Sequence, residues 1–515
     1  MESLKDRGIL LWGCGERGEM AMTMFPWLPV RAAVDGDPTK QGKTWHGVEV
    51  ISREAYLERY AELPVLVTPD RPEGIVSFLE AHGRHRFWLL RDLMQAREGA
   101  GFAIEAGRDE QDAIWAQQKW QLMAAIYEAQ ASRWHCIEKQ YFELRFLHGK
   151  RKRHMGEILA LLGKAKHPAL TVRTATICAP FLELLNVPLT FVTFGDLPKE
   201  TDLLIIHGLS MKDEILQAAL QAEAREIPII FTEDGFLRSI EPYDGELRFA
   251  TSHAIQLDMG GLYIHADSPS LLEESMNSEK VPRNEEIRRV HQLVQKIRQE
   301  RLTKYNHQQV TGARLGSLGR EKVLVVDQVY GDKSIAYGWA TDETFMEMYR
   351  KAVEENPDAD IYVKAHPVPS KGHFGSVREG GRIHLLTEPM NPIELIEQMD
   401  KVYVCTSQLG FEAAFCGKEV HTFGMPFYAG WGFTVDAQPN PNRHRKRTVE
   451  EAFYFAYIVC TVYVSYKTHG ICSIEQAIEE LLELRNAYWR RNDGTGKKGW
   501  KDGDAAKSER AGAGL

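Results

Sequence analysis

Cysteine is scarce in this chain, which has 7 cysteines among 515 residues. No two of them have the Cys-x-x-Cys spacing, and their positions fit none of the ligand spacings of structural zinc sites. We therefore expect no metal centre. Scattered single cysteines are typical of a reduced compartment, so the sequence predicts a cytoplasmic protein rather than a disulfide-bonded secreted one.

Long hydrophobic runs are missing too. No stretch reaches the roughly 20 apolar residues that a membrane span needs. The longest candidate, 453–464, contains several tyrosines, and we interpret it as a packed helix or strand, with membrane contact as the alternative. The chain starts with charges at Glu2, Lys5, Asp6 and Arg7, which is not the layout of a secretory signal.

The chain also has no excess of positive charge. Its 63 basic and 72 acidic residues give a formal net charge of −9. Binding of nucleic acid over a broad surface needs a basic patch or a basic domain, so we expect no nucleic-acid partner. Apolar residues make up 43% of the chain, which excludes a disordered protein and is enough to build two or three compact domains.

Short apolar segments alternate with helical segments at the start of the chain. Strands are expected at 9–12, 30–34, 65–67 and 87–90. This alternation is typical of a parallel α/β sheet, and we assign residues 1–107 to a small Rossmann-like domain. The next segment, 108–160, has no strand pattern but has apolar and aromatic residues at helical spacing, which predicts a helical connector.

The alternation of strands and helices returns in two further blocks. We assign the first lobe to 161–316 and the second to 317–489. The expected strands are 189–194, 203–206 and 229–231 in the first lobe, and 323–326, 361–364, 402–405 and 420–423 in the second. The predicted fold class is therefore α/β, with two Rossmann-like lobes after a small Rossmann-like domain and a helical connector. Residues 490–515 are rich in Gly, Lys and Asp, and we expect a disordered tail.

A glycine-rich loop follows the first expected strand. Gly13, Gly15 and Gly18 form the G-x-G-x-x-G pattern and open a helix, so a dinucleotide pyrophosphate could approach the helix N-terminus. Asp35 ends the next strand, where an acid that binds a ribose would stand. A bound dinucleotide is one hypothesis for this domain. A structural or substrate-positioning role is the other.

Polar clusters follow the strands of the two later lobes. Glu233 and Asp234 come directly after the strand at 229–231, and Gln328 and Asp332 come after the strand at 323–326. Ligands of open α/β sheets bind beyond the carboxyl ends of the strands. Each cluster also has an ordinary interpretation, because Asp-Gly is common in turns and an aspartate often caps a helix.

Two more clusters follow strands of the second lobe. Lys364 and His366 could bind phosphate, with Pro367 fixing the turn. Thr406 and Ser407 stand where a helix begins, and they could bind phosphate there or serve only as an N-cap. Taken together, the four clusters predict a nucleotide cleft between the lobes.

Residues 200–485 resemble a known family, the bacterial capsule polysaccharide β-Kdo transferases of the KpsC type, which use CMP-Kdo. The segments that carry the resemblance are EDGFLRS at 233–239, LYI at 262–264, DSPS at 267–270, KYN at 304–306, QVYGD at 328–332, HP at 366–367, GFEA at 410–413 and PFYAGWG at 426–432. The last of these is the most specific signal. The resemblance implies a GT-B fold and a transfer of Kdo, or a related ulosonic acid, from CMP-Kdo to a glycan or glycolipid acceptor, with no metal or cofactor required.

The resemblance also implies roles for individual residues. Retention of the anomeric configuration implies a double displacement with Asp332 as nucleophile, Glu233 or Asp234 as acid/base, and Gln328 as an orienting group. The donor site would be formed by two further sets of residues. His366, Thr406 and Ser407 would hold the CMP phosphate, with Pro367 and Glu412 beside them. Arg238, Lys304 and Lys364 are candidates for the sugar carboxylate or the phosphate.

Two alternatives of different kinds remain open. The acid-acid-Gly, His-Pro and Ser/Thr elements also resemble bacterial sialyltransferases, in which case Asp234 would be the general base, the product anomer would be inverted and Asp332 would be structural. A non-enzymatic alternative is a nucleotide-sugar-binding scaffold in a polysaccharide assembly or export complex. Long members of the family carry two transferase modules, whereas this chain has the motif set once, so the resemblance implies one linkage per chain.

Two basic runs, 150–154 and 443–447, contrast with the acidic background. A polybasic cluster gains about 1 kcal/mol per charge near an anionic bilayer. Peripheral contact with an anionic inner membrane that carries a lipid-linked acceptor is therefore one hypothesis for these runs, and a solvated face is the other.

Overall fold

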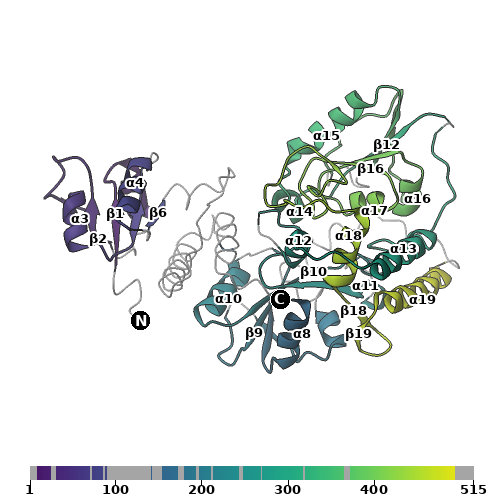
Figure 1. Cartoon of the computed structure of the whole chain (residues 1–515), viewed down its shortest axis with the longest axis horizontal. Coiled ribbons are helices and arrows are strands. Elements are labelled where there is room, and N and C mark those ends of the chain that lie inside the picture. The colour runs from purple at the N-terminus through teal and green to yellow at the C-terminus, as the bar shows by residue number, and fades with distance from the viewer. Residues whose placement is uncertain are drawn as a thin grey trace.

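The computed structural model describes residues 8–24, 30–69, 72–84, 87–89, 141, 154–171, 179–192, 196–209, 213–242, 247–267, 270–316, 319–364 and 372–492. Within these ranges the chain forms three β-sheets with helices packed on them (Figure 1). The helical connector expected at 108–160 and the tail expected at 490–515 lie almost entirely outside the described residues.

The first sheet belongs to the N-terminal domain and has the strand order β3-β4-β2-β1-β5-β6. Its strands are β1 (Ile9–Trp12), β2 (Val30–Val34), β3 (Thr44–Trp45), β4 (Val48–Ile51), β5 (Val65–Val67) and β6 (Phe87–Leu89). All pairs are parallel except the short hairpin of β3 and β4. The helices are α2 (Glu16–Met24), α3 (Arg53–Arg59) and α4 (Glu73–Ala81). β1, β2 and β5 have the bounds that the apolar segments predict.

The second sheet has the order β19-β18-β11-β10-β9-β7-β8. β7 (Pro168–Thr171), β8 (Thr190–Val192), β9 (Leu203–His207) and β10 (Ile229–Asp234) are parallel, and β11 (Ala254–Asp258) is antiparallel to β10. The helices of this part of the chain are α8 (Met155–Lys164), α10 (Asp213–Ala224), α11 (Leu247–Ala250) and α12 (Leu271–Asn277). β9, β10 and β11 are almost wholly buried, as expected for central strands covered on both faces.

The third sheet is parallel throughout and has the order β14-β13-β12-β15-β16-β17. Its strands are β12 (Lys322–Val326), β13 (Asp360–Lys364), β14 (Ile383–Leu385), β15 (Lys401–Val404), β16 (Glu419–Thr422) and β17 (Val435–Asp436). The helices between them are α14 (Lys333–Tyr337), α15 (Asp342–Glu355), α16 (Pro392–Glu397) and α17 (Leu409–Phe415). The mixed α/β class with two later α/β lobes is therefore confirmed.

After the third sheet the chain returns to the second one. It passes through α18 (Val449–Phe453) and a π-helix, η3 (Tyr454–Val459), into β18 (Thr461–Ser465) and β19 (Gly470–Cys472), and ends in α19 (Ile474–Asn492). β18 pairs antiparallel with β11, so residues 461–472, which the sequence pattern places in the second lobe, complete the sheet of the first. α19 lies beside α13 (Asn284–Gln299), joined to it by an ion pair of 2.6 Å between Arg289 and Glu475 (Figure 1).

The apolar run 453–464 is packed inside this return segment. Its residues form the end of α18, the π-helix and the start of β18, and most are buried. The interpretation as a packed helix or strand is confirmed. In the ranges that the structure describes, no helix is long and apolar enough to cross a bilayer.

Candidate functional site between the two lobes

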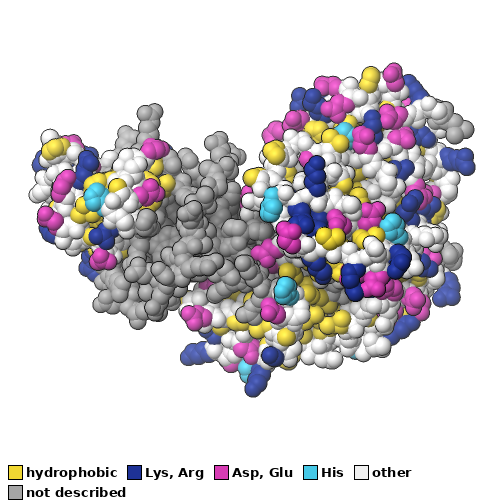
Figure 2. Space-filling view, viewed as in Figure 1, with side chains coloured by type: hydrophobic (Ala, Val, Ile, Leu, Met, Phe, Trp, Pro, Cys, Tyr) yellow, Lys and Arg dark blue, Asp and Glu magenta, His cyan; other side chains and the backbone are white. Residues whose placement is uncertain are grey.

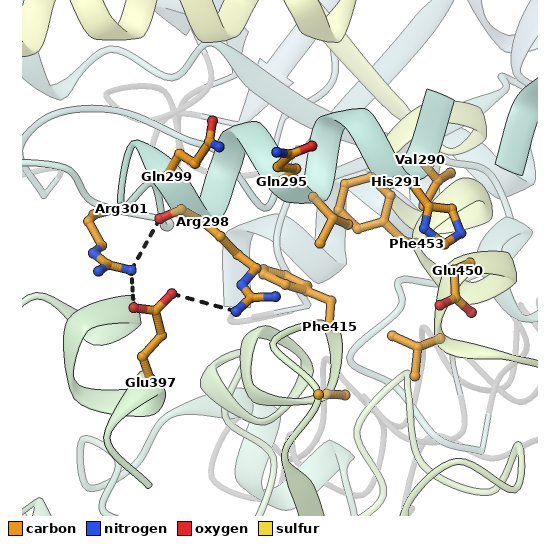
Figure 3. Close-up of a pocket in the computed structure, with 14 residues that line it drawn as sticks. Val290, His291, Gln295, Arg298, Gln299, Arg301, Glu397, Phe415, Glu450 and Phe453 are labelled. Atoms are coloured by element: carbon orange, nitrogen blue, oxygen red, sulfur yellow. Dashed lines mark hydrogen bonds and ion pairs between the residues drawn. The ribbon is translucent and has the colours of Figure 1, made fainter. Parts of the chain in front are cut away.

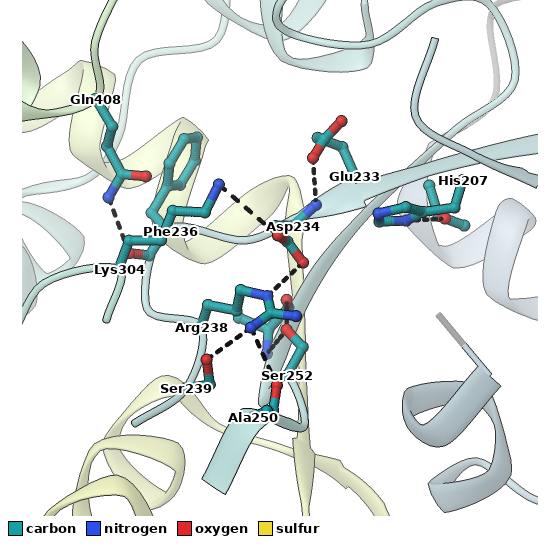
Figure 4. A network of polar contacts seen from close by, with 12 residues as sticks. His207, Glu233, Asp234, Phe236, Arg238, Ser239, Ala250, Ser252, Lys304 and Gln408 are labelled. Atoms are coloured by element: carbon teal, nitrogen blue, oxygen red, sulfur yellow. Dashed lines mark hydrogen bonds and ion pairs between the residues drawn. The ribbon is translucent and has the colours of Figure 1, made fainter. Parts of the chain in front are cut away.

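Two adjacent acids end the central strand β10. Asp234 is buried, and its Oδ1 accepts a hydrogen bond of 2.8 Å from Nε of Arg238, a side chain that is 1% exposed. Its Oδ2 lies 3.7 Å from Nζ of Lys304. Glu233 is only partly buried, and its Oε1 accepts a hydrogen bond of 3.0 Å from the backbone N–H of Asp234 (Figure 4). Asp234 is therefore fixed by two cations, whereas Glu233 is held by a backbone N–H group.

The turn after the acids is fixed by its own contacts. Gly235 lies against β11 so closely that a Cβ at this position would stand 2.5 Å from Cβ of Ala254. Arg238 donates through Nη1 to Oγ of Ser239 at 2.8 Å and to the backbone oxygen of Ala250 at 3.0 Å. The buried guanidinium thus has carbonyl and hydroxyl acceptors as well as Asp234, which is what a buried charge requires. Arg238 supports Asp234 and has little capacity left for a donor sugar.

Lys304 reaches Asp234 from a segment that is tied to the same turn. The backbone oxygen of Lys304 accepts from the N–H groups of Arg238 and Ser239, each at 3.2 Å. Nδ2 of Asn306, a fully buried residue, donates to the backbone oxygens of Ser239 and Thr303, each at 2.9 Å. Lys304 is 29% exposed, so its ammonium remains accessible from the crevice.

The environments of the two acids move their pKa values in opposite directions. Burial raises the pKa of Glu233, and the neighbouring Asp234 carboxylate acts in the same direction. Burial alone would raise the pKa of Asp234 as well, but Lys304 and Arg238 hold it below its usual value. A pair whose pKa values are pushed apart is typical of an acid/base site, with the higher one as the group that exchanges the proton. This favours Glu233 over Asp234 as the acid/base.

An aromatic cluster packs against the turn that follows these acids. Phe236 stacks on Tyr457 of the π-helix at 4.8 Å and contacts Phe427 at 4.8 Å and Tyr263 at 5.1 Å. Tyr263 donates through its hydroxyl to the backbone oxygen of Asp234 at 3.3 Å. Phe427 belongs to the PFYAGWG segment, so the most specific sequence signal packs against Phe236, two residues after Asp234. π-Helices occur often at functional sites, and this one packs behind the acids.

In the second lobe, a polar network joins the ends of β12 and β15. Oε1 of Gln328 accepts from the backbone N–H of Thr406 at 2.9 Å, and Nε2 of Gln328 donates to Oγ1 of Thr406 at 3.0 Å. The amide also lies 3.3 Å from Oγ of Ser334. Gly338 and Gly424 make this possible, because a Cβ at either would stand within 2.7 Å of Cγ2 of Thr406. Gln328 and Thr406 are therefore brought together, as the sequence predicts.

Asp332 is the N-cap of α14. Its Oδ1 accepts from the backbone N–H of Ser334 at 2.8 Å, and the residue is exposed. The capping interpretation is thus realised in the structure. The charge of Asp332 also acts on the first lobe: burial raises the pKa of Tyr263, and the charges of Glu233, Asp234 and Asp332 act in the same direction. Because Oδ1 caps the helix, Oδ2 of the same Asp332 carboxylate is left to react with a substrate.

Ser407 and Glu412 belong to the segment around α17. Oγ of Ser407 accepts from the N–H of Leu409 at 3.3 Å, a local turn bond just before a short helix whose N-cap is Gln408. Glu412 is buried and accepts from Oγ1 of Thr303 at 2.5 Å and from Nε2 of Gln408 at 3.1 Å. Gln408 also donates to the backbone oxygen of Phe236 at 2.9 Å. In this geometry Glu412 ties the lobes together rather than facing a donor.

Lys364 ends β13 beside the same network, and burial lowers the pKa of its ammonium. His366 and Pro367, the remaining predicted donor residues, lie outside the described residues. One pair was missed by the sequence analysis: Asp327 accepts from Nδ1 of His373 at 3.0 Å, and both side chains are 2% exposed. Phe345 stacks on His373 at 3.7 Å. The only sequence signal for this pair was that Asp327 directly precedes Gln328, a predicted site residue.

A separate cavity of about 770 Å³ lies between α13, α17 and α18 (Figure 3). Phe415 and Phe453 form part of its wall, and Arg298 and Arg301 pair with Glu397 at one end. It contains none of the predicted site residues. The chemistry-bearing groups gather instead at the ends of β10, β12 and β15.

Residues 208–469 match the family described as capsule polysaccharide biosynthesis protein. The chain belongs to this family. The match contains both lobe ends described above, the acid pair and the Gln328 and Thr406 network, and it leaves the N-terminal domain outside.

Two relatives are similar to a little over half of this chain. The chain is 35% identical over 308 residues to the capsule polysaccharide modification protein LipA of Neisseria meningitidis serogroup B, covering 56% of this chain and 42% of that protein. It is 36% identical over 287 residues to the lipopolysaccharide-processing protein LpsZ of Rhizobium meliloti, covering 54% of this chain and 64% of that protein. The chain thus spans about two fifths of the length of the meningococcal relative.

A solved structure of a related protein is the KpsC β-Kdo 2,4 transferase of Thermosulfurimonas dismutans. It is 33% identical to this chain, with a TM-score of 0.55, and the similarity covers 61% of this chain and 97% of that one. The predicted resemblance to KpsC-type proteins is therefore confirmed at the level of family and fold.

The glycine loop of the N-terminal domain is held by Asp35. Oδ2 of Asp35 accepts from the backbone N–H of Cys14 at 2.8 Å, and Lys40 pairs with the same oxygen at 3.2 Å. Gly13 has φ of +109°, and a Cβ at Gly18 would stand 2.2 Å from the oxygen of Gly13, whereas Gly15 is unobstructed. Two of the three glycines are thus explained by packing, and Asp35 ties the loop.

The basic run 443–447 does not present its charges together. Arg443 is buried and donates to the backbone oxygen of Ala429 at 2.8 Å, and Arg447 is buried and donates to the backbone oxygen of Met276 at 2.7 Å. Arg445 pairs with Glu279 at 2.8 Å. The solvated-face interpretation is therefore wrong for the two buried arginines, which are structural. Over the face shown in Figure 2, cations and acids of the described residues are interspersed. Residues 150–153 of the other run lie outside the described residues.

Metal-ligating side chains do not gather in the described ranges: no group of three or more His, Cys, Asp or Glu is placed to hold a metal ion there.

Proposed function

We propose that this chain is a glycosyltransferase that transfers Kdo, or a related ulosonic acid, from CMP-Kdo to a hydroxyl of a glycan or lipid-linked acceptor in the synthesis of a surface polysaccharide. The observation that carries the proposal is the pair of acids with opposed pKa shifts at the end of β10, together with Gln328 and Thr406 after β12 and β15 and Asp332 at the N-cap of α14. The likeness to the KpsC transferase structure supports the choice of donor.

The reaction would proceed in two displacements. In the first, a carboxylate oxygen of Asp332 attacks the anomeric carbon, and the bond from that carbon to the phosphate oxygen breaks, so that its electron pair leaves with CMP. In the second, the acceptor oxygen attacks the same carbon, the Asp332 carboxylate departs, and Glu233 takes the hydroxyl proton. Two inversions give net retention. No metal is required, because the leaving group is a single phosphate.

The remaining residues would hold the donor. Thr406 and Ser407, with His366 and Pro367, would contact the CMP phosphate, where Gln328 positions Thr406. Lys304 and Lys364, which are both partly buried, are the candidate cations for the sugar carboxylate or the phosphate. Asp234 and Arg238 would support Glu233 and Lys304, and Glu412 would hold the lobes in register.

An inverting, sialyltransferase-like reaction is the second candidate, and it is favoured by the capping bond of Asp332. In that case Asp332 is structural and an acid of β10 activates the acceptor directly. Asp332→Asn separates the candidates, because asparagine caps a helix as well as aspartate does but is a poor nucleophile. The retaining mechanism predicts at least a 1,000-fold loss (about 4 kcal/mol) of CMP release from CMP-Kdo by this variant.

Full CMP release by Asp332→Asn would leave Asp332 as a helix cap only and favour the inverting reaction. Binding of CMP without any release from CMP-Kdo, across a set of acceptor glycans and glycolipids, would favour a nucleotide-sugar-binding scaffold. A parallel assay with UDP-sugars checks the donor class, and these should give no turnover.

A further inference from the structure

Tyr330 is an exposed aromatic residue in the turn that joins β12 to α14. It stands between Gln328, which meets Thr406 at 3.0 Å, and Asp332, the N-cap of α14. Tyr330 is 61% exposed, and its neighbour Val329 is also exposed. Single apolar side chains are ordinary on protein surfaces. A ring held in water within two residues of both Gln328 and Asp332, however, is placed to be covered by a ligand of this site.

The turn that carries Tyr330 has a fixed shape. The backbone N–H of Asp332 donates to the oxygen of Val329 at 3.1 Å, which closes a four-residue turn with Tyr330 at its second position. Gly331, the third residue, has φ of +78°, a value that favours glycine. The hydrogen bonds of the Gln328 amide fix one end of this segment, and the helix cap formed by Asp332 fixes the other. Tyr330 is therefore carried at the tip of a short turn that is anchored on both sides.

The Tyr330 ring is supported from the core of the lobe. It lies 5.6 Å from the ring of His373, which stacks on Phe345 at 3.7 Å with an angle of 4° between the planes. The side chain of His373 is 2% exposed and Phe345 is fully buried, so the three rings form a series from the core to the surface. Hydrogen bonding to Asp342 raises the pKa of Tyr330, so the phenol has a partner as well. A ring that is already ordered loses little conformational entropy when a ligand covers it.

The carboxylate of Asp327 joins this support to the Gln328 network. Its Oδ1 accepts from the backbone N–H of Gln328 at 2.9 Å and lies 3.0 Å from Nδ1 of His373. One oxygen therefore fixes both the residue that reaches Thr406 and the ring behind Tyr330. The Cα atoms of Gln328 and Tyr330 are at most about 7 Å apart, because two residues of extended chain span no more than that. A group bound near Thr406 and a ring stacked on Tyr330 can thus belong to one nucleotide.

We propose that Tyr330 stacks on the pyrimidine ring of the donor nucleotide, while the phosphate of the same nucleotide is held near Thr406. This inference rests on the proposed function and deepens it, because it assigns the residue that holds the base. A base is favoured over the saturated ring of an acceptor sugar, since Tyr330 belongs to the lobe that carries the proposed phosphate-binding residues and presents a flat π face. Stacking tolerates any base. Tyr330 therefore contributes affinity and does not select cytosine.

Isothermal titration calorimetry with CMP and with ribose 5-phosphate tests the stacking. Tyr330→Ala removes an exposed side chain, so the fold should be unaffected. CMP should bind about tenfold more weakly to Tyr330→Ala than to the wild type, because stacking of a base on an aromatic ring contributes this much or more. Ribose 5-phosphate has no base, so its affinity should stay within about twofold. Tyr330→Phe keeps the ring and should bind CMP nearly as well as the wild type.

Nuclear magnetic resonance of bound CMP gives a second readout. An aromatic ring shields protons that lie over its face, so the ring protons of cytosine should move upfield when CMP binds to the wild type. This upfield shift should be absent in Tyr330→Ala. Phe191→Ala is the matched control, because Phe191 is also an exposed aromatic residue, at 47%, but lies on β8 of the first lobe. It should bind CMP as the wild type does.

An unchanged CMP affinity in Tyr330→Ala, with the same cytosine signals as in the wild type, would overturn the inference. So would an equal loss of affinity for CMP and ribose 5-phosphate, because the turn and not the stacking would then be affected. CMP release from CMP-Kdo separates the inference from the proposed function. Weaker CMP binding by Tyr330→Ala, without CMP release by the wild type, would support the stacking and contradict the transferase function. CMP release by the wild type and by Tyr330→Ala with the same KM would do the reverse.

Discussion

At the scale of single residues, the two adjacent acids of β10 have different contacts and different pKa shifts. Asp234 is bound to Arg238 at 2.8 Å and lies near Lys304, so its charge is compensated. Glu233 has one backbone donor, and its pKa is raised by burial. The sequence leaves open which of them is the acid/base. In the proposed mechanism Glu233 takes this role, because Arg238 and Lys304 compensate the charge of Asp234. The sequence could not show this difference, since the segment 303–306 lies far away along the chain.

The first prediction compares the two acids by isosteric amide substitution. Asp234→Asn leaves a buried arginine without its carboxylate, so the free energy of unfolding should fall by about 3 kcal/mol. Glu233→Gln should leave the unfolding midpoint nearly unchanged while steady-state CMP release falls at least 100-fold, because the slow second displacement leaves the sugar on the protein. Thermal unfolding and CMP release on the same preparations check both. Equal losses of stability in the two variants would contradict the division of roles.

Residue chemistry was predictable from the sequence only where a motif pointed to it. Glu233, Asp234, Gln328 and Thr406 stand at strand ends as expected, because the strands are strongly apolar and the acids follow them directly. The Asp327 and His373 pair was missed, since the two are joined only through a fold in which residues 46 positions apart meet. Arg443 and Arg447 were misread because burial of a charge depends on carbonyl partners that no local pattern shows.

At the scale of elements, the turn from β10 into Arg238 depends on a close approach of two strands. Gly235 donates to the backbone oxygen of Ala254 at 2.9 Å, and there is no space for a side chain between them. The EDG motif is therefore also a packing motif. Because Gly235 has no side chain, β11 can lie directly beside the end of β10 that carries the two acids.

The second prediction concerns this turn. Gly235→Ala places a methyl group 2.5 Å from Cβ of Ala254, and overpacking of this kind should lower the free energy of unfolding by about 2 kcal/mol. Adding Ala254→Gly in the double variant should restore part of that loss, which denaturant unfolding measures. Gly156→Ala is the control, because nothing lies within 4 Å of a Cβ there. A neutral Gly235→Ala would show that the strands separate easily.

Element bounds were well predicted from apolar patterns, whereas one pairing was not. β1 spans Ile9–Trp12 and β2 spans Val30–Val34, as the apolar segments predict. Residues 461–472 were placed in the second lobe, but β18 pairs with β11 of the first, because the sequence of a strand does not state which neighbour it will pair with. The return of the chain through α18 and the π-helix depends on contacts between segments that are far apart in the sequence.

At the scale of the whole molecule, a buried carboxyl group joins the two lobes. Glu412 of the second lobe accepts from Thr303, which lies in the segment tied to Arg238 and Ser239, and from Gln408, which also reaches Phe236. Burial raises the pKa of Glu412 to about 7. The contact between the lobes therefore includes a group that titrates near neutrality.

The third prediction follows from this titration. Folded Glu412 binds its proton more tightly than the unfolded chain, whose ordinary pKa is 4.5, so stability should fall as pH rises from 4.5 to about 7. The upper bound is on the order of 3 kcal/mol, at about 1.4 kcal/mol for each tenfold change in proton affinity. Thermal midpoints at several pH values should therefore decline less in Glu412→Gln than in the wild type. The exposed Glu388, changed to Gln, is the control and should follow the wild type. Parallel curves for all three proteins would mean that Glu412 does not titrate in this range.

The central claim is that the two lobes meet around a carboxylate that attacks a CMP-linked acidic sugar. Glu233→Gln should slow the second displacement and leave the sugar on the protein. Mass spectrometry of this variant after incubation with CMP-Kdo, followed by peptide mapping, tests the claim most directly. The account predicts an added sugar residue on Asp332, absent from the variant that also carries Asp332→Asn. CMP release without any adduct, or an adduct on another carboxylate, would contradict it.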